Sequence, residues 1–233
     1  MTTTNRTRTL TALLLVLLLA APVALAQGSA AGTVPRHEEL RYDWHLGRLV
    51  GRLAGLFLPS EGEGVLTSRR DNGRITSELV ITSEQSREGE FWRYGSRIDA
   101  TSGHAREAWS SYLWRGEKKS RREEIAKDGV MDVVAGIYAI RKDLPKTSRQ
   151  MEIWSDGKLY PVLVIPLGQE TRTVAGKQVV TRHYSIRGYD APGARRWKGS
   201  LELWLADDAA ATPVEIHIER NLANLQLRLQ QLP

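Results

Sequence analysis

Histidine and cysteine are the residue types whose spacing most often reveals a metal site or a nucleophile. The chain has no cysteine and five histidines, which are His37, His45, His104, His183 and His217. No two of them stand in an HxH or HExxH spacing, which would aim two imidazole rings at one metal ion. The absence of cysteine excludes a thiolate nucleophile, a cysteine-ligated zinc ion and disulfides. We therefore expect no metal and no cofactor.

Serine and carboxylate motifs of enzymes are missing or misplaced. Ser155 and Lys158 fit the S-x-x-K pattern of serine acylases, but that chemistry needs a helix start, and Asp156-Gly157 is typical of a hairpin turn. In the pairs Glu123-Glu124 and Asp207-Asp208, neighbours point to opposite faces of a strand or bond to the backbone of a turn. No G-x-S-x-G elbow occurs. The sequence therefore predicts no catalytic residues and a protein that is not an enzyme.

Four side chains are candidates for binding a ligand, namely Arg141, Tyr138, Trp204 and Trp154. Arg141 either stabilises the negative end of a predicted helix or points into a cavity toward a carboxylate or phosphate. Trp204 is opposite in phase to the leucines of its strand, so its face is predicted to line a pocket or to lie under the helix. Each tryptophan taken alone is typical of a core. The seven together leave room for an apolar groove that holds a lipid or acyl chain.

One short central helix is predicted at about 131–143, within the stretch 129–145. Asp132 is its expected N-cap, because a carboxylate accepts hydrogen bonds from the first turn and suits the positive end of the dipole. Apolar residues then recur at helical spacing and form one stripe, made of Val133, Ile137, Ile140 and Leu144. The β-branched content lowers the helix propensity, so we expect packing on the concave face of a sheet to stabilise this helix.

Strand-like alternation surrounds the helix on both sides, as in Leu40-Arg41-Tyr42-Asp43-Trp44, with hairpin turns at Asp71-Asn72-Gly73 and Asp156-Gly157. Val50 to Leu58 is predicted to run back from the first strand. The stretch from Leu159 to Leu167 is nearly all apolar, which is typical of a central strand buried on both faces. With roughly ten to twelve strands in all, the fold class is mainly β: a strongly curved antiparallel sheet or open barrel around one short helix.

A basic run ends the first half of the predicted sheet. It consists of Lys118, Lys119, Arg121 and Arg122. One interpretation is a solvated edge strand whose charges prevent pairing with other chains; the other is an anion-binding patch.

The first 26 residues are predicted to be an export signal peptide. Two arginines precede an apolar run from Leu10 to Ala20, Pro22 breaks the run, and Ala24-Leu25-Ala26 is a small-x-small cleavage site. We expect cleavage after Ala26. The alternative is a retained anchor, because the seventeen residues from Leu10 to Ala26 reach the lower limit for crossing a bilayer.

Removal of the leader leaves 207 of the 233 residues, which we divide into a flexible lead-in at 27–37 and a single β domain at 38–233. No later stretch is long and apolar enough to span a membrane, so we expect a periplasmic or otherwise exported protein. The formal net charge of +6 falls to +4, because the leader carries two arginines and no acid. This mild excess suits an anionic membrane or glycolipid surface, and export argues against nucleic acid.

The order of several short motifs resembles the exported bacterial family of domain of unknown function 3108 (DUF3108). The motifs are the Tyr42 strand before 47–51, the helix from Asp132 to Arg141, the turn 175–176, and 203–208 leading to 213–214. In the helix Asp132, Tyr138 and Arg141 match the family pattern, whereas Ala135 replaces its serine, which argues against a serine-centred mechanism. The resemblance covers nearly all of the mature chain. It implies a curved sheet wrapped around a helix, similar to the periplasmic lipoprotein carriers.

These features together predict a non-enzymatic periplasmic β protein that binds or chaperones an amphipathic envelope component, namely a lipid, a glycolipid or an envelope protein. One alternative is a hydrolase or lyase of an envelope polymer, with polar groups gathered from several strands; Asp132, Arg141 and a histidine in one cleft would favour it. The other is a purely structural partner in an envelope complex. The state of the concave side of the sheet, filled by the helix or left open, separates these possibilities best.

Overall fold

The computed structural model describes residues 33–47, 61–83, 89–114, 116–155, 157–220 and 223–233. The predicted signal peptide at 1–26, most of the predicted lead-in and the predicted return strand at 50–58 lie outside the described residues. The strands and the helix follow one another as β1 (His37–Leu46), β2 (Glu61–Asp71), β3 (Arg74–Ser83), β4 (Phe91–Asp99), β5 (Ala105–Trp114), β6 (Glu117–Glu124), β7 (Val130–Met131), α2 (Val133–Asp143), β8 (Arg149–Ser155), β9 (Lys158–Val174), β10 (Lys177–Gly188), β11 (Ser200–Ala206), β12 (Pro213–Arg220) and β13 (Ala223–Leu229).

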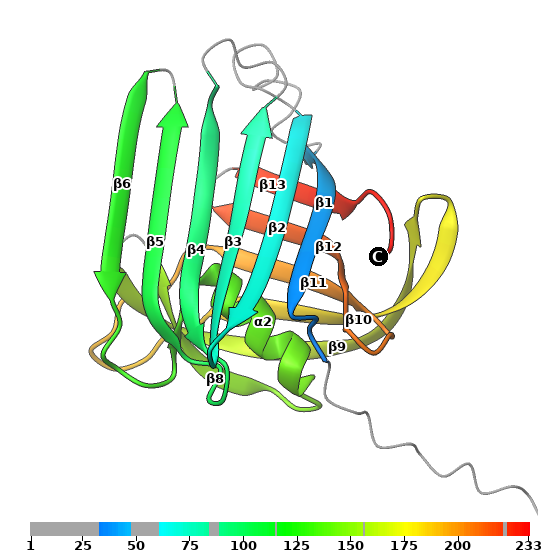
Figure 1. Cartoon of the computed structure of the whole chain (residues 1–233). Coiled ribbons are helices and arrows are strands. Elements are labelled where there is room, and N and C mark those ends of the chain that lie inside the picture. Colours follow the sequence, from blue (N-terminus) through cyan, green and yellow to red (C-terminus); the bar gives the residue numbers. More distant parts are fainter. Residues whose placement is uncertain (1–32, 48–60, 84–88, 115, 156, 221–222) are drawn as a thin grey trace, which may run out of the picture.

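The thirteen strands that the structure describes belong to one curved sheet, in the order β6-β5-β4-β3-β2-β1-β13-β12-β11-β10-β9-β8-β7. Neighbouring strands are antiparallel, except that β7 pairs with β8 in parallel. Figure 1 shows β1–β6 across the front and β9–β13 running crosswise behind them, with α2 between the two layers at the lower end. The described strands do not close into a barrel, because β6 and β7 are the two ends of the order. The predicted mainly β fold around one short helix is therefore confirmed, with β7, a strand of two residues, as an addition that alternation did not reveal.

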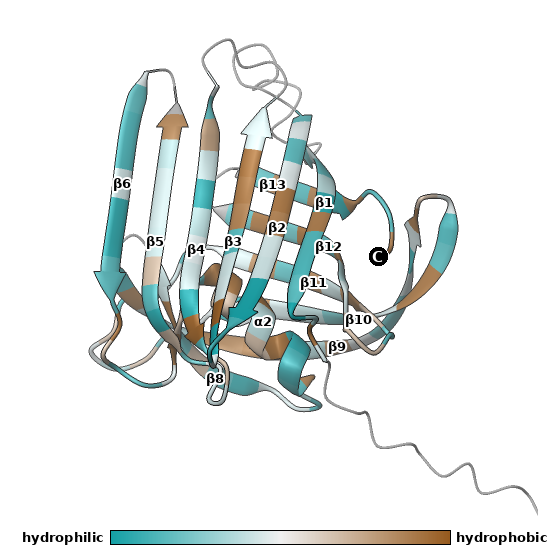
Figure 2. Ribbon diagram, viewed as in Figure 1, coloured by the Kyte–Doolittle hydropathy of each residue, from teal (hydrophilic) through white to brown (hydrophobic). Residues whose placement is uncertain are grey.

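Period-two alternation decides which side chains face the interior. On β1, Leu40, Tyr42 and Trp44 are buried while the residues between them are exposed. Figure 2 shows a continuous hydrophobic stretch in the middle of β2 and of β3, and within it the buried residues still alternate with less buried ones. The prediction for 159–167 is wrong in part: Val162 and Val164 are buried, but Leu159 and Leu167 are 42% and 50% exposed. This strand is therefore fully buried on one face only.

The helix is built as the sequence predicts. Oδ1 of Asp132 accepts a hydrogen bond from the backbone N–H of Ala135 at 2.7 Å, which caps the first turn. Leu144 ends the helix in the left-handed conformation, and its N–H donates to the carbonyl of Ile140. Of the predicted stripe, Ile137, Ile140 and Leu144 are buried in the main core cluster, and Val133 packs at its margin. The helix thus fills the concave side of the sheet next to it.

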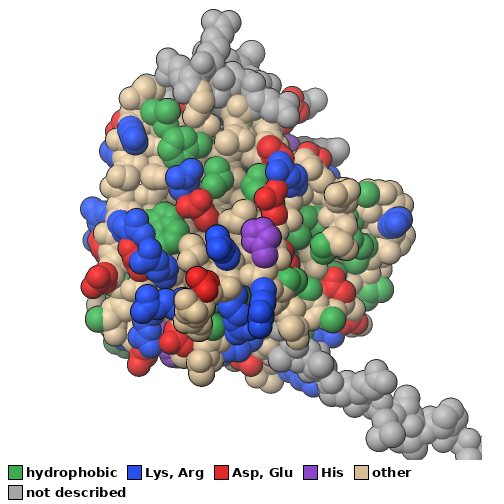
Figure 3. Space-filling model, in the orientation of Figure 1, with side chains coloured by type: hydrophobic (Ala, Val, Ile, Leu, Met, Phe, Trp, Pro, Cys, Tyr) green, Lys and Arg blue, Asp and Glu red, His purple; other side chains and the backbone are tan. Residues whose placement is uncertain are grey.

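The front face of β1–β6 is covered by charged side chains. Figure 3 shows lysine and arginine interspersed with aspartate and glutamate over this face, with hydrophobic side chains among them. The predicted basic run lies on β6, whose residues are almost all exposed, at one end of the sheet. The sheet order therefore supports the edge-strand interpretation of this run. No helix among the described residues is long and apolar enough to cross a membrane.

Candidate functional site

Arg141 is held inside the fold. Its guanidinium is 1% exposed and forms a bidentate ion pair with Glu38, in which Nη1 lies 2.7 Å from Oε2 and Nη2 lies 2.8 Å from Oε1. Nε donates to the carbonyl of Ala211 at 3.1 Å, and Nη2 donates to that of Ala210 at 3.2 Å. These bonds tie the end of α2 to β1 and to the loop before β12. Arg141 uses its donors within the protein and lines neither hollow described below.

The structure does not bring the four predicted ligand-binding residues into one site. Tyr138 and Trp154 are buried in the second core cluster, where Trp154 Nε1 donates to Glu123 on β6 at 2.8 Å. Trp204 lies on β11 and belongs to the main core cluster, and its ring packs against those of His183 and His217. Trp204 is not among the residues that line either hollow described below, and α2 packs on β3, β4, β7 and β8 rather than on this strand.

Asp132 lies at a small apolar gap between α2 and the sheet. The gap has a volume of about 20 Å³, and residues lining it include Gly136, Met151 and Trp197. Burial raises the pKa of Asp132, although hydrogen bonding from the N–H of Ala135 opposes the shift. Such a gap holds about one water molecule, so it has no room for an acyl chain.

Catalytic or metal-binding groups do not converge around the helix. Within the described ranges, neither Asp132 nor Arg141 hydrogen-bonds a histidine. In the same ranges, no three histidine, aspartate or glutamate side chains are placed to hold one metal ion. Ser155 and Lys158 face each other across the turn between β8 and β9, as the hairpin interpretation predicts.

Trp204 is the centre of an aromatic cluster on the outer face of β9–β12. The antiparallel register places it opposite His183 on β10 and Glu215 on β12. Its ring stacks on His183 with centroids 4.1 Å apart, and the ring of His217 is tilted against it at 4.6 Å. The guanidinium of Arg172 lies 4.2 Å from the ring centroid, within range of a cation–π interaction. Charged and aromatic side chains, and no part of α2, thus cover this tryptophan.

Carboxylates surround the two histidines of the cluster. His183 lies between two of them, with Nδ1 2.8 Å from Glu170 and Nε2 2.9 Å from Glu202. Glu170 also accepts a hydrogen bond from Trp204 Nε1 at 3.2 Å. Burial raises the pKa of Glu170, but the hydrogen bonds from His183 and Trp204 outweigh it, so the pKa lies below its usual value. The network connects side chains of β9, β10 and β11.

Glu215 is the most buried acid of this network. Its side chain is 8% exposed and lies 2.7 Å from His217 Nε2, 3.2 Å from Arg228 Nε and 3.4 Å from Arg172 Nε. Burial raises the pKa of Glu215, but His217 and the two arginines more than offset this and hold it below its usual value. The carboxylate is therefore held in its ionised form at neutral pH.

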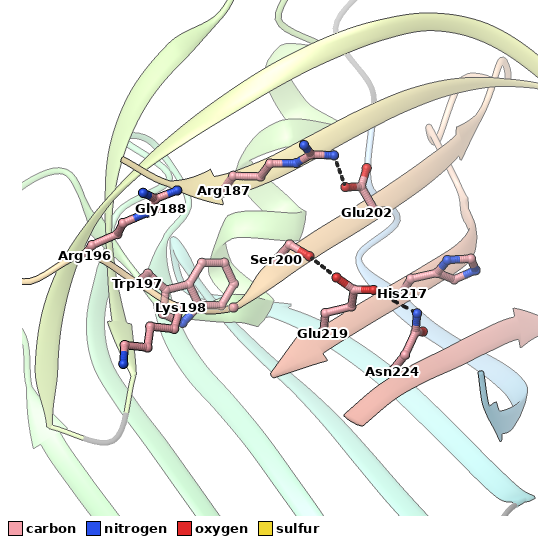
Figure 4. A pocket seen from close by; sticks show the side chains of 11 residues that line it. Arg187, Gly188, Arg196, Trp197, Lys198, Ser200, Glu202, His217, Glu219 and Asn224 are labelled. Atoms are coloured by element: carbon pink, nitrogen blue, oxygen red, sulfur yellow. Dashed lines mark hydrogen bonds and ion pairs between the residues drawn. The ribbon is translucent and has the colours of Figure 1, made fainter. Parts of the chain in front are cut away.

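A large hollow opens beside this network, between the loop 189–199 and the outer faces of β11–β13. Its volume is about 720 Å³ (Figure 4). Glu202 and His217 belong both to its lining and to the network around Trp204. The remaining polar side chains of the lining are Arg187, Arg196, Lys198, Ser200, Glu219 and Asn224.

Trp197 anchors the loop that forms one wall of the hollow. Its side chain is buried in the main core cluster, so the residues around it on the loop have a fixed position. Two glycines permit this packing: a Cβ at Gly188 would lie 2.2 Å from the carbonyl oxygen of Trp197, and a Cβ at Gly199 would lie 2.8 Å from its ring. Any larger residue at Gly188 must displace the loop backbone.

The hollow carries groups of both charges. Figure 4 shows Arg196 and Lys198 on one side and Glu219 and Asn224 on the other. Glu219 accepts hydrogen bonds from Ser200 at 3.1 Å and Asn224 at 3.0 Å. The wall with Arg196 and Lys198 can donate hydrogen bonds to an anion, and the wall with Glu219 can accept hydrogen bonds from a cation or a hydroxyl group.

Sequence reasoning missed the lining of this hollow. Period-two alternation places Ser200 and Glu202 opposite the leucines of β11, and His217 and Glu219 opposite the isoleucines of β12. Alternation assigns faces, but it does not show which strands are neighbours or in what register. Knowledge that β11 pairs with β12 would have brought these four residues together.

Comparison with known proteins supports the fold alone. No protein-family model and no curated protein matches the sequence. A solved structure, a beta-barrel-like protein of domain of unknown function DUF1849 from Brucella abortus, is similar with a TM-score of 0.52 and 10% sequence identity. The match covers 87% of this chain and 98% of that chain. The chain is therefore similar in fold to a β-barrel-like domain of unknown function. The resemblance to DUF3108 that the motifs indicated is not shown by these comparisons.

Proposed function

We propose that this chain is an exported, non-catalytic binding protein that holds the polar part of an amphipathic envelope component in the hollow beside the loop 189–199. The component is a lipid, a glycolipid or an envelope protein. The observation that carries the proposal is the hollow itself, whose volume of about 720 Å³ falls in the range of about 300–1,000 Å³ that ligand sites occupy. Its walls are anchored by Trp197 and by the network around Trp204.

The packing around α2 supports recognition of a polar group over enclosure of an acyl chain beside the helix. The gap between α2 and the sheet has a volume of only about 20 Å³. The hollow, in contrast, is lined by charged and hydrogen-bonding side chains and lies on the face turned away from α2. An amphipathic ligand would therefore place its polar part in the hollow.

The export and the envelope location in this proposal are supported by the sequence. The basic segment, apolar run and Ala-x-Ala site of 1–26 support export. The mild positive charge of the mature chain favours contact with anionic envelope surfaces.

Purification from the periplasm tests the proposal. The full chain is expressed with its leader, and the mature protein is analysed by native mass spectrometry before and after lipid extraction. We expect a chain that begins at Gln27 and carries a bound molecule of discrete mass. The double variant Lys198→Ala/Glu219→Gln should lose this molecule, whereas Lys177→Ala, at the tip of the β9–β10 hairpin, should keep it.

Three outcomes would overturn the proposal. A chain that stays in the cytoplasm with Met1 in place contradicts export. A mature wild-type protein free of any bound molecule contradicts binding. A molecule retained equally by the hollow variant contradicts the assigned site.

A further inference from the structure

Only some of the charged side chains that line the hollow have an oppositely charged partner among the described residues. Arg187 is paired with Glu202 at 3.1 Å, and Arg196 is paired with Asp190 at 3.3 Å. Lys198 is exposed and has no hydrogen-bond or ion-pair partner among the described residues. A cation without a counter-ion at the wall of a hollow is available to an incoming anion.

The opposite wall holds an acid that also lacks an oppositely charged partner among the described residues. Glu219 accepts hydrogen bonds from the neutral groups of Ser200 and Asn224, which fix its carboxylate in place. In the described part of the chain, no lysine or arginine is paired with it. Its negative charge is therefore available to an incoming cation.

From this pairing of walls we infer that the ligand is a zwitterion, with an anionic phosphate or carboxylate at Lys198 and a protonated amine at Glu219. The inference rests on the proposed function and names the chemistry of the polar part. A simple anion would gain from Lys198 but meet the repulsion of Glu219 and Glu202, and a simple cation would meet that of Lys198 and Arg196. A molecule that carries both charges satisfies both walls.

The same chemistry occurs in a free small molecule and in a lipid headgroup. Phosphoethanolamine carries a phosphate and an ammonium group a few bonds apart, and phosphatidylethanolamine presents that group at a membrane surface. The hollow is open to solvent on the outer face of the sheet, so both sources fit its chemistry.

Calorimetric titration of the mature protein with phosphoethanolamine tests the inference, with inorganic phosphate and ethanolamine as the two half-ligands. We expect phosphoethanolamine to bind at least about tenfold more tightly than either half, since each wall contributes a charge-assisted hydrogen bond. Lys198→Ala and Glu219→Gln should each weaken binding by about tenfold. Lys177→Ala, a lysine that does not line the hollow, should leave it unchanged. Circular dichroism of each variant checks that the fold is intact.

Phosphate that binds as tightly as phosphoethanolamine, or a Glu219→Gln variant of unchanged affinity, would overturn the inference. Flotation with vesicles then separates the sources. Binding to phosphatidylethanolamine vesicles indicates the headgroup, and binding of free phosphoethanolamine without vesicle binding indicates a small zwitterion. Binding to anionic phosphatidylglycerol vesicles alone would refute the zwitterion while leaving the proposed function intact, whereas a protein that binds none of these probes and purifies without a ligand refutes both.

Discussion

Glu38→Gln is the substitution that we expect to destabilise this fold most strongly. It removes the only carboxylate paired with Arg141 in the described structure, whose guanidinium is 1% exposed. The new amide group also presents N–H donors to a guanidinium that has only donors. Removing one partner of a buried ion pair costs about 3–5 kcal/mol. For a domain of this size that corresponds to a fall in Tm of roughly 6–20 °C.

Thermal and urea unfolding followed by circular dichroism measure this loss. The matched control is Glu39→Gln on the same strand, because Glu39 pairs with Arg41 on the exposed face and its loss should change the Tm little. The double variant Glu38→Leu/Arg141→Met should recover most of the stability, since it leaves no buried charge unpaired. A loss below about 1 kcal/mol for Glu38→Gln, the range of an exposed pair, would refute the reasoning.

Three further predictions concern the helix, the loop and the acid network. Gly136→Ala should stabilise the protein by about 0.8–1 kcal/mol, because a Cβ there meets no atom within 4 Å and alanine favours the helix; a lower urea midpoint would contradict this. Gly188→Ala should destabilise it by about 1–3 kcal/mol and weaken ligand binding at the hollow, because the new Cβ collides with the backbone of Trp197; unchanged unfolding and binding curves would count against the described packing. The pKa of Glu215 is lower in the folded protein than in the unfolded chain, so protonation of its carboxylate favours unfolding. The stabilisation that the charged carboxylate contributes is therefore complete above the usual pKa of 4.5 and is lost as the pH falls through the lower folded-state pKa. The urea midpoints of wild type and Glu215→Gln should therefore differ at pH 7 and converge below pH 4.5, and a constant difference would show that the charge of Glu215 is not responsible.

Local patterns were sufficient to predict the helix and the faces of many strands. Asp132, the spacing from Ile137 to Leu144 and the turn after it together specify where α2 begins and ends. Alternation likewise predicts that Leu40, Tyr42 and Trp44 face the core. These features depend on neighbours in the chain, which the sequence displays directly.

The buried ion pair of Arg141 and the lining of the hollow both depend on contacts between distant segments, which the sequence does not display. Glu38 and Arg141 are 103 residues apart, and no periodicity connects them. The register of β11 with β12 shifts at a bulge between Trp204 and Leu205, which changes which residues lie opposite each other. The outer face of this strand is not uniformly apolar as predicted, because it carries Ser200 and Glu202 as well as Trp204, and the tryptophan is covered by ring stacking and a guanidinium. Charged residues on neighbouring strands supplied a cover that hydrophobic patterning does not predict.

The most direct test of the central claim is to map where phosphoethanolamine binds, using the amide and indole N–H resonances of the ¹⁵N-labelled mature protein. The account predicts that chemical-shift changes cluster at the Trp197 indole and at the amides of Lys198, Ser200, Glu219 and Asn224. Changes that gather instead around Trp92 and Tyr94 on the inner face of β4, or no changes at all, would contradict the claim that this hollow is the binding site.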